Sequence, residues 1–184
     1  RQHYNIKPFI MKKSNFMSFA LIAMVFFTGS FANAQTTNIV EAAIASENHT
    51  TLVAAVKAAD LVGVLTGEGP FTVFAPTNEA FDNLPEGTVA SLLQPENIKA
   101  LQGVLTYHVV AGKFSASDVI GLIKKNDGKA TVKTVSGGDI VLSLAYGKVI
   151  ITDANGGTAT VTAADLNQTN GIIHVVDEVL LPKM

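Results

Sequence analysis

Two histidines, His108 and His174, are the residues of this sequence with the widest range of possible chemistry. A histidine titrates near neutral pH and can act as a general base or as a metal ligand. Two imidazoles and a carboxylate such as Asp165 would suit zinc or iron, but the sequence contains no His-x-x-x-His pair on one helical face. Both histidines are expected inside strands, where a buried imidazole is more often a hydrogen-bonded core residue. We therefore predict structural roles for both, with no metal and no cofactor.

Nucleophilic catalysis is not indicated either. In an extended segment, alternation places His174 and Asp177 on opposite faces, so this acid cannot orient this imidazole as in a Ser-His-Asp relay. The sequence has no G-x-S-x-G elbow. A hydrolase of matrix polysaccharide would need two carboxylates facing each other across a cleft, whereas acids such as Asp153 and Asp165 are scattered singly. We predict that the protein is not an enzyme.

Two glycine-containing segments resemble binding loops but lack their essential residues. The segment 153–157 begins like a calcium loop, yet its twelfth position is Ala164 where a bidentate glutamate is needed. The segment 67–70, Gly-Glu-Gly-Pro, lacks the Lys-Ser/Thr pair of a phosphate-binding loop. Both segments are predicted to be turns.

The first 34 residues have the organisation of a leader. Met11 is followed by Lys12 and Lys13, an apolar run over 16–27, and the sequence Ala-Asn-Ala ending at Ala34. This order of a basic start, an apolar middle and an A-x-A site is typical of a secretory signal peptide. We assign residues 1–10 to upstream sequence, 11–34 to the signal peptide and 35–184 to a single domain. The protein is therefore expected to be secreted or periplasmic after cleavage near Ala34.

The charge of the remaining chain excludes one class of partner. The whole chain has 13 Lys and Arg against 15 Asp and Glu. Four of these cations, including the one arginine, lie before residue 35, which leaves 9 Lys, no Arg and all 15 acids. An acidic chain without arginine lacks the electrostatic footprint of phosphate-backbone binding, so no nucleic acid partner is expected.

Composition sets two further bounds. No cysteine is present, which excludes disulfides and thiolate chemistry. No apolar run after residue 34 approaches the roughly 20 residues of a membrane span, so the mature chain is predicted to have none. About 150 residues are enough to bury one core without covalent staples.

The pattern of apolar residues, caps and glycines predicts helices in the first half and strands in the second. Asn38, Thr50 or Thr51, Thr77, and Ser115 or Ser117 stand where helix N-caps belong. Helices are expected over 38–46, 50–65, 77–81, 86–93, 95–103 and 115–125, and strands over 71–75, 106–110, 130–135, 139–145, 148–152, 158–163 and 171–181. The later strands are joined by glycine turns as a meander. The fold class is therefore α+β.

Three segments, read in order, resemble the fasciclin-like domain family. The first is 69–81 (GPFTVFAPTNEAF), the second is 105–112 (LTYHVVAG) and the third is 169–182 (TNGIIHVVDEVLLP). The resemblance covers roughly residues 38–183. It implies a wedge of two β-sheets with several short helices packed alongside, and it implies adhesion or matrix interaction rather than catalysis.

The resemblance also implies site residues. In animal members, integrin contacts have been attributed to a Tyr-His segment and to an Asp-Ile pair before the last strand. The matching positions here are Tyr107, His108, Asp165 and Leu166, with leucine in place of isoleucine. With Tyr146, taken from the strand pattern as an exposed loop aromatic, these are the predicted partner-binding residues; Phe114 is a further candidate. Structural motif positions are assigned to Thr72, Phe74, Pro76, Thr77, Asn78, Phe81, Asn170, Gly171 and His174.

Two functions from different classes follow. The first is a secreted or periplasmic, non-enzymatic adhesion or interaction module that binds a cell-surface or matrix protein or polysaccharide. The alternative is a carrier or sensor of a small apolar or haem-like ligand, with His108 or His174 as the polar group in an apolar site.

Overall fold

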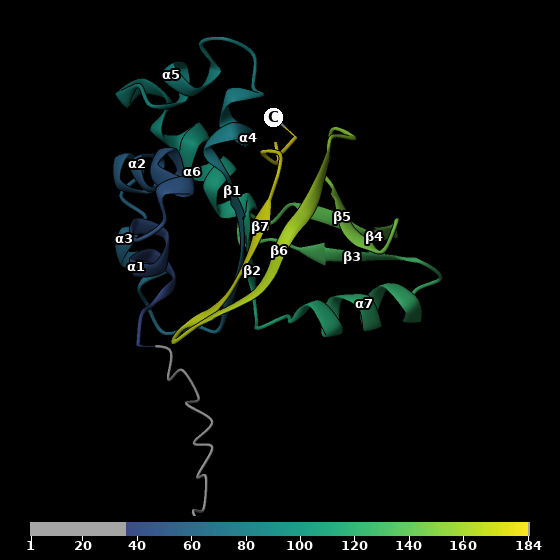
Figure 1. The fold of residues 1–184 in the computed structure, drawn as a ribbon. Coiled ribbons are helices and arrows are strands. Elements are labelled where there is room, and N and C mark those ends of the chain that lie inside the picture. The colour runs from purple at the N-terminus through teal and green to yellow at the C-terminus, as the bar shows by residue number, and fades with distance from the viewer. Residues whose placement is uncertain (1–35, 184) are drawn as a thin grey trace, which may run out of the picture. The chain divides into compact units, whose positions relative to one another are not determined.

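The computed structural model describes residues 36–183, which belong to one compact unit (Figure 1). The predicted signal peptide and the upstream residues 1–10 lie outside the described residues. The helices are α1 (Ile39–Ile44), η1 (Glu47–His49), α2 (Thr50–Ala58), α3 (Val62–Leu65), α4 (Asn78–Asp82), α5 (Thr88–Leu92), η2 (Pro95–Asn97), α6 (Ile98–Tyr107) and α7 (Ala116–Lys125). The strands are β1 (Phe71–Pro76), β2 (Val109–Ala111), β3 (Lys129–Lys133), β4 (Asp139–Ala145), β5 (Lys148–Thr152), β6 (Thr158–Gln168) and β7 (Gly171–Val176). The predicted α+β class is confirmed.

The seven strands form one hydrogen-bonded order, β2-β1-β7-β6-β5-β4-β3. The central strands β1 and β7 run parallel, and every other neighbouring pair is antiparallel. The start of β6, Thr158–Thr160, pairs with β5, whereas the rest of β6 pairs with β7 through two register shifts. The two sheets expected from the sequence are thus two parts of one continuous series of hydrogen-bonded strands, and both parts include β6.

Both faces of the central strands are covered. Val73 and Ile173 belong to a core formed with the helices α1–α4 and α6. Phe74 and Val176 point to a second core, which α7 and the strands β3–β6 complete. In Figure 1, α1–α6 gather on one side of β1 and β7, and α7 lies beside β3. This arrangement explains why β7 is buried along its whole length.

Three predicted helix starts are confirmed. The Asn38 and Ser115 side chains accept hydrogen bonds from the third residue of α1 and α7, and Glu41 and Asp118 return a bond to complete two capping boxes. Thr77 accepts from the Ala80 amide at the start of α4. Short polar side chains satisfy amides that a helix leaves unpaired at its N-terminus, so these starts are locally encoded.

The predicted strand over 106–110 is wrong at its start. The helix α6 continues through Tyr107, His108 is its C-cap, and β2 contains only Val109–Ala111. The reason is packing, because Leu101, Val104 and Leu105 form a helical apolar edge that continues into Tyr107. Burial on that helical face overrides the strand preference of the aromatic and β-branched residues.

Several other boundaries differ from the predictions, and β6 continues to Gln168 instead of ending at residue 163. The helix expected over 50–65 is split, because Asp60 adopts a left-handed φ of 56° and the amides of Asp60 and Leu61 bond back to Lys57 and Val56. This pattern is a Schellman motif, which ends a helix. The strand expected over 171–181 stops at Val176, because its partner there, Pro76, is the last residue of β1; further on, the amide of Leu180 bonds to the His108 side chain.

The helix α7 offers a simple test of this assignment. Gly121 lies in its interior, and a Cβ added there meets no atom within 4 Å. Gly121→Ala is expected to raise the free energy of unfolding by about 0.5–1 kcal/mol, because alanine loses less backbone entropy on folding. Urea denaturation would measure the change, and a loss of stability would contradict the helical assignment.

Candidate functional site

His108 lies wholly inside the protein, at the point where α6 meets the C-terminal segment. Its side chain is 3% exposed. Nδ1 lies 2.8 Å from the Val104 carbonyl oxygen, and Nε2 lies 2.9 Å from the Leu180 amide nitrogen. A backbone amide can only donate, so Nε2 must accept and Nδ1 must carry the proton. Both nitrogens of the neutral ring are therefore engaged.

Burial also controls the ionisation of His108. Desolvation lowers its pKa from 6.5 to about 4, and the Val104 hydrogen bond and the charge of Asp153 only partly oppose this. The ring is neutral at physiological pH because a charged imidazole would lose its hydration and its bond from Leu180. His108 is a structural residue of the core.

Tyr107 is equally buried, at 0% exposure. Its hydroxyl donates to the Asp139 carbonyl at 2.7 Å and accepts from the Ala154 amide at 3.0 Å. The side chain thus joins α6 to β4 and to the turn that follows β5. The prediction that Tyr107 and His108 contact a partner needs correction, because neither side chain reaches the surface.

His174 organises the segment between β2 and α7. Its ring stacks on Phe74 with centroids 5.7 Å apart. Nδ1 accepts from the Asp165 amide at 3.3 Å, and Nε2 donates to the Phe114 carbonyl at 2.8 Å. On the neighbouring strand, Thr72 donates to the Gly112 carbonyl at 2.7 Å and accepts from the Phe114 amide at 2.9 Å. Two strands therefore hold one loop through side chains.

Other motif positions also join elements together. Asn78 accepts from the Thr51 amide at 3.0 Å and donates to the Glu47 carbonyl at 2.9 Å, which ties α4 to α2. Asn170 accepts from the Ile39 amide at 3.0 Å and donates to the Leu65 carbonyl at 2.8 Å. Such bonds satisfy backbone groups at loops and helix ends. Pro76, Phe81 and Gly171 are buried beside them.

Of the remaining partner-binding candidates, Phe114 is half-buried against the second core, whereas the other three are exposed and lie on different hairpins. Tyr146 occupies the β4–β5 turn and is fully exposed. Asp165 and Leu166 lie in β6, and Leu166 is 43% exposed. Asp165 has a left-handed φ of 61°, and its carboxylate accepts from the Ala116 amide at 2.7 Å. Asp165 therefore has a structural task at the start of α7, which leaves Tyr146 and Leu166 as side chains available to a partner.

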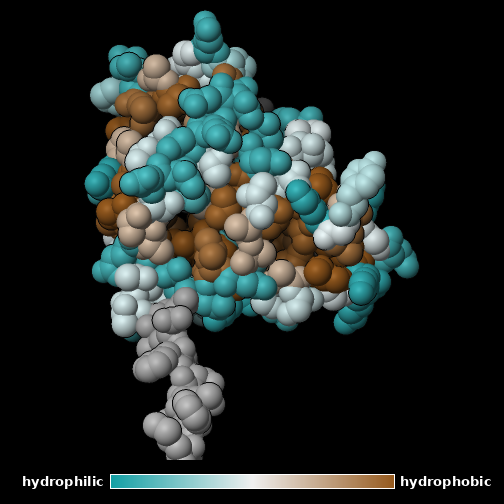
Figure 2. All heavy atoms as spheres, in the orientation of Figure 1, coloured by the Kyte–Doolittle hydropathy of each residue, from teal (hydrophilic) through white to brown (hydrophobic). Residues whose placement is uncertain are grey.

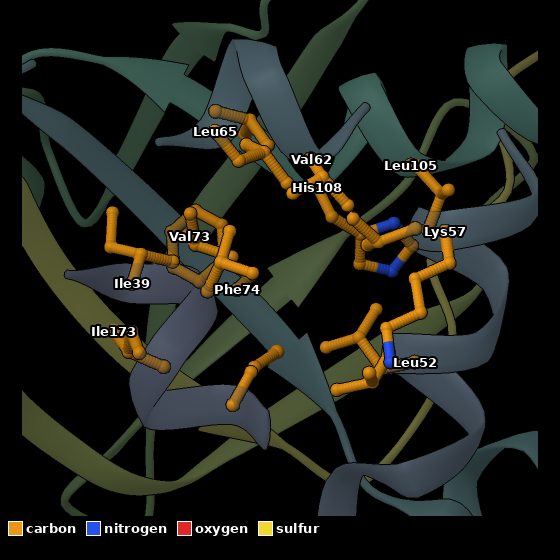
Figure 3. Close-up of a pocket in the computed structure, with 16 residues that line it drawn as sticks. Ile39, Leu52, Lys57, Val62, Leu65, Val73, Phe74, Leu105, His108 and Ile173 are labelled. Atoms are coloured by element: carbon orange, nitrogen blue, oxygen red, sulfur yellow. The ribbon is translucent and has the colours of Figure 1, made fainter. Parts of the chain in front are cut away.

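An apolar cavity of about 40 Å³ lies between α1–α3 and the sheet (Figure 3). Aliphatic side chains line it, together with Phe74, Lys57 and His108. Sites for drug-sized ligands measure roughly 300–1,000 Å³, so this cavity has no room for a haem. Since both nitrogens of His108 are bonded, the ring also offers no polar group to a ligand.

Metal and calcium binding were the other kinds of site considered from the sequence. No group of three or more His, Asp or Glu side chains in this range is placed to hold a metal ion. The Asp153 carboxylate is occupied by the amides of Asn155, Gly157 and Leu181, as in an internal turn rather than a calcium loop. Within the same range, no helix combines the length and apolar character that crossing a membrane requires.

The sequence motifs do not reveal one charge pattern of the domain. Between residues 119 and 152 the chain contains five lysines and two acids, although the domain as a whole is acidic. Counting charges element by element, rather than over the chain, would have found it.

Comparison with known proteins agrees with this architecture. Residues 47–182 match the model of the fasciclin domain. The chain is 50% identical over 146 residues to Protein sll1483 of Synechocystis sp., covering 79% of this chain and 74% of that protein. It is 34% identical to the cell surface glycolipoprotein MPB83 of Mycobacterium bovis, covering 67% of this chain and 48% of that protein.

A solved structure shows the same fold. The FAS1 domain pair of the insect cell adhesion molecule Fasciclin I superposes with a TM-score of 0.69 at 19% identity, covering 80% of this chain and 51% of that one. The chain thus spans about half the length of this structure and of MPB83. The seven hydrogen-bonded strands, flanked by short helices, have the fold of a fasciclin domain. Together with the match over residues 47–182, this shows that the chain belongs to the fasciclin domain family.

Proposed function

We propose that this protein is a non-enzymatic interaction module, secreted or periplasmic, that binds a cell-surface or matrix partner through side chains presented on a rigid scaffold. The names of two similar proteins support this, since one is a cell surface glycolipoprotein and the other a cell adhesion molecule. In Figure 2, hydrophobic side chains are visible among hydrophilic ones across the middle of the molecule. Exposed apolar side chains of this kind suit contact with a partner.

The observation that carries the proposal is the conformation of Tyr146. Its side chain is fully exposed, yet its backbone has a left-handed φ of 52°, followed by Gly147 with φ 77°. Tight hairpin turns of this kind favour asparagine or aspartate before glycine, and a bulky residue there costs stability. A strained, exposed aromatic side chain does not stabilise the core, so we infer that Tyr146 contacts a partner molecule.

Tyr146→Asn tests the proposal. Asparagine suits the turn, so the free energy of unfolding is expected to rise by up to about 1 kcal/mol. Binding to intact cells of the organism that produces the protein, and to its isolated extracellular matrix, is expected to weaken at least tenfold, or about 1.4 kcal/mol, as for an interfacial tyrosine. A pull-down with the exported protein at physiological salt would measure it.

The matched control is Val64→Asn, because Val64 is 53% exposed and lies on α3 rather than on the β4–β5 hairpin. This variant is expected to keep full binding. Unchanged binding by Tyr146→Asn would remove Tyr146 from the contact surface, and failure of the wild-type protein to bind either target would refute the interaction module.

The carrier of a small apolar ligand remains the second candidate, and the cavity beside His108 is the observation behind it. Its small volume and the fully bonded ring favour the interaction module. An absorbance spectrum of protein purified from its host would decide between them, since a Soret band would support a haem carrier.

A further inference from the structure

Positive charge is concentrated in one part of this acidic protein. The segment 119–152, which begins inside α7 just after Asp118 and runs to the end of β5, carries five lysines and two acids. The rest of the described chain carries four lysines and thirteen acids. A partner that approaches this segment therefore meets a net positive surface on a domain that is otherwise negative.

Strand register places three of these lysines on one face. Lys129 pairs with Ser143, which pairs with Ile150, and Ala145 pairs with Lys148. Residues directly opposite each other in antiparallel strands share a face, as do residues two apart along a strand. We call this set the outer face of β3–β5: Lys129, Thr131, Lys133, Asp139, Val141, Ser143, Ala145, Lys148, Ile150 and Thr152.

The outer face is accessible to a partner. The opposite face carries Ile140, Leu142 and Ile151, which are buried with Val119 and Ile123 of α7. In contrast, every member of the outer face is exposed or half-buried. Since α7 occupies the inner side, the outer face remains available without any rearrangement of the fold.

The side chains of the outer face suit a hydroxylated, negatively charged ligand. Thr131, Ser143 and Thr152 provide hydroxyl groups that both donate and accept hydrogen bonds. Val141 and Ile150 are half-buried and form a small aliphatic strip between the lysines. Lys133 lies four residues along β3 from Lys129, roughly 13 Å away, and Lys148 lies two strands across and two residues along, roughly 12 Å away.

Negative charge on this face is limited. Asp139 is its one carboxylate, and it lies 3.9 Å from the Lys133 ammonium with both side chains well exposed. Such an exposed pair holds Lys133 only weakly. Lys124 and Lys125 end α7 a few residues before Lys129, with Asp127 between them, and Tyr146 lies at the turn between β4 and β5.

We propose that the outer face of β3–β5 binds an anionic polysaccharide, with the lysines meeting its carboxylates and the hydroxyl side chains its sugar hydroxyls. This inference rests on the proposed function and names the chemical class of its partner. A protein partner would need a larger apolar centre than Val141 and Ile150 supply. A linear polyanion instead matches separated point charges on an extended polar surface.

The experiment uses polygalacturonate as the carboxylated probe and dextran as the neutral one, with the exported protein in titrations at several salt concentrations. We expect binding to polygalacturonate that weakens steeply with salt, and none to dextran. The double variant Lys129→Gln/Lys148→Gln is expected to bind at least tenfold more weakly and with a smaller dependence on salt. The matched control, Lys57→Gln/Lys99→Gln, removes the same charge from the acidic part and is expected to bind almost as the wild type.

Several results would overturn the inference. These are equal binding to dextran, equal weakening by the control variant, or no binding to polygalacturonate. Self-association in sedimentation that Lys129→Gln/Lys148→Gln abolishes would assign the face to a second copy of the chain, and preferential binding to phosphatidylglycerol vesicles would assign it to a membrane surface. In each case, continued binding of the wild type to cells or to isolated matrix would leave the interaction module standing, whereas failure of the wild type to bind both would refute that module.

Discussion

Gly171→Ala is expected to remove more than about 4 kcal/mol from the free energy of unfolding, and to leave the chain largely unfolded. A Cβ at Gly171 would overlap the carbonyl oxygen of Phe71 and lie 2.9 Å from the Ile39 side chain. The clash is with backbone in the parallel β1–β7 pair at the centre of the sheet. A backbone clash between two paired strands cannot be relieved by a side-chain rotation, so the strands must separate.

The measurement is urea denaturation followed by circular dichroism. Gly63→Ala is the matched control, because a Cβ at Gly63 in α3 meets no atom within 4 Å. That variant is expected to be as stable as the wild type or slightly more so. A Gly171→Ala protein that unfolds at the wild-type urea concentration would show that β1 and β7 are not packed as closely as described.

Acid is expected to destabilise the fold through His108. Its pKa is lowered from 6.5 to about 4 in the folded state. As the pH falls below 6.5, His108 of the unfolded chain binds a proton, whereas the buried ring of the folded chain stays neutral until the pH approaches 4. The free energy of unfolding therefore falls between pH 6.5 and about 4, with a total loss from this residue of about 3 kcal/mol. Above pH 6.5 the ring is neutral in both states and contributes no pH dependence.

His108→Gln isolates this effect. A glutamine oxygen can accept from the Leu180 amide but does not titrate, so the variant is expected to be less stable at pH 7 and to lose less stability on acidification. His108→Ala, which leaves Val104 and Leu180 without a side-chain partner, is expected to cost about 1–3 kcal/mol at pH 7. If the stability difference between wild type and His108→Gln is the same at pH 4.5 and pH 7, the buried neutral ring is contradicted.

Local sequence signals predicted much of the scaffold because their physics is local. Asn38, Thr77 and Ser115 cap helices with bonds to amides a few residues away, which any segment of that sequence can form. The glycines after Tyr146 and in the turn 153–157 supply the positive φ values that hairpins require. These features predicted the meander of β3–β6 before any long-range contact was known.

The candidate site was less predictable, because exposure depends on segments distant in sequence. Tyr107 and His108 are in a motif that suggests contact, yet their partners Asp139, Ala154 and Leu180 lie 32 to 72 residues away. Whether a side chain is covered depends on which element folds over it, and sequence spacing does not contain that information. Tyr146, in contrast, was correctly expected at an exposed turn.

The sequence by itself determined the class of fold, three of the helix starts, the glycine turns and the family, because each depends on residue type and short-range spacing. Only the tertiary structure decided that α6 runs through Tyr107, that β6 joins both parts of the sheet, and that three lysines share one face of β3–β5. The physical reason is the same in each case. Side-chain burial and strand register are properties of pairs of segments, and a pair forms only when the whole chain has folded.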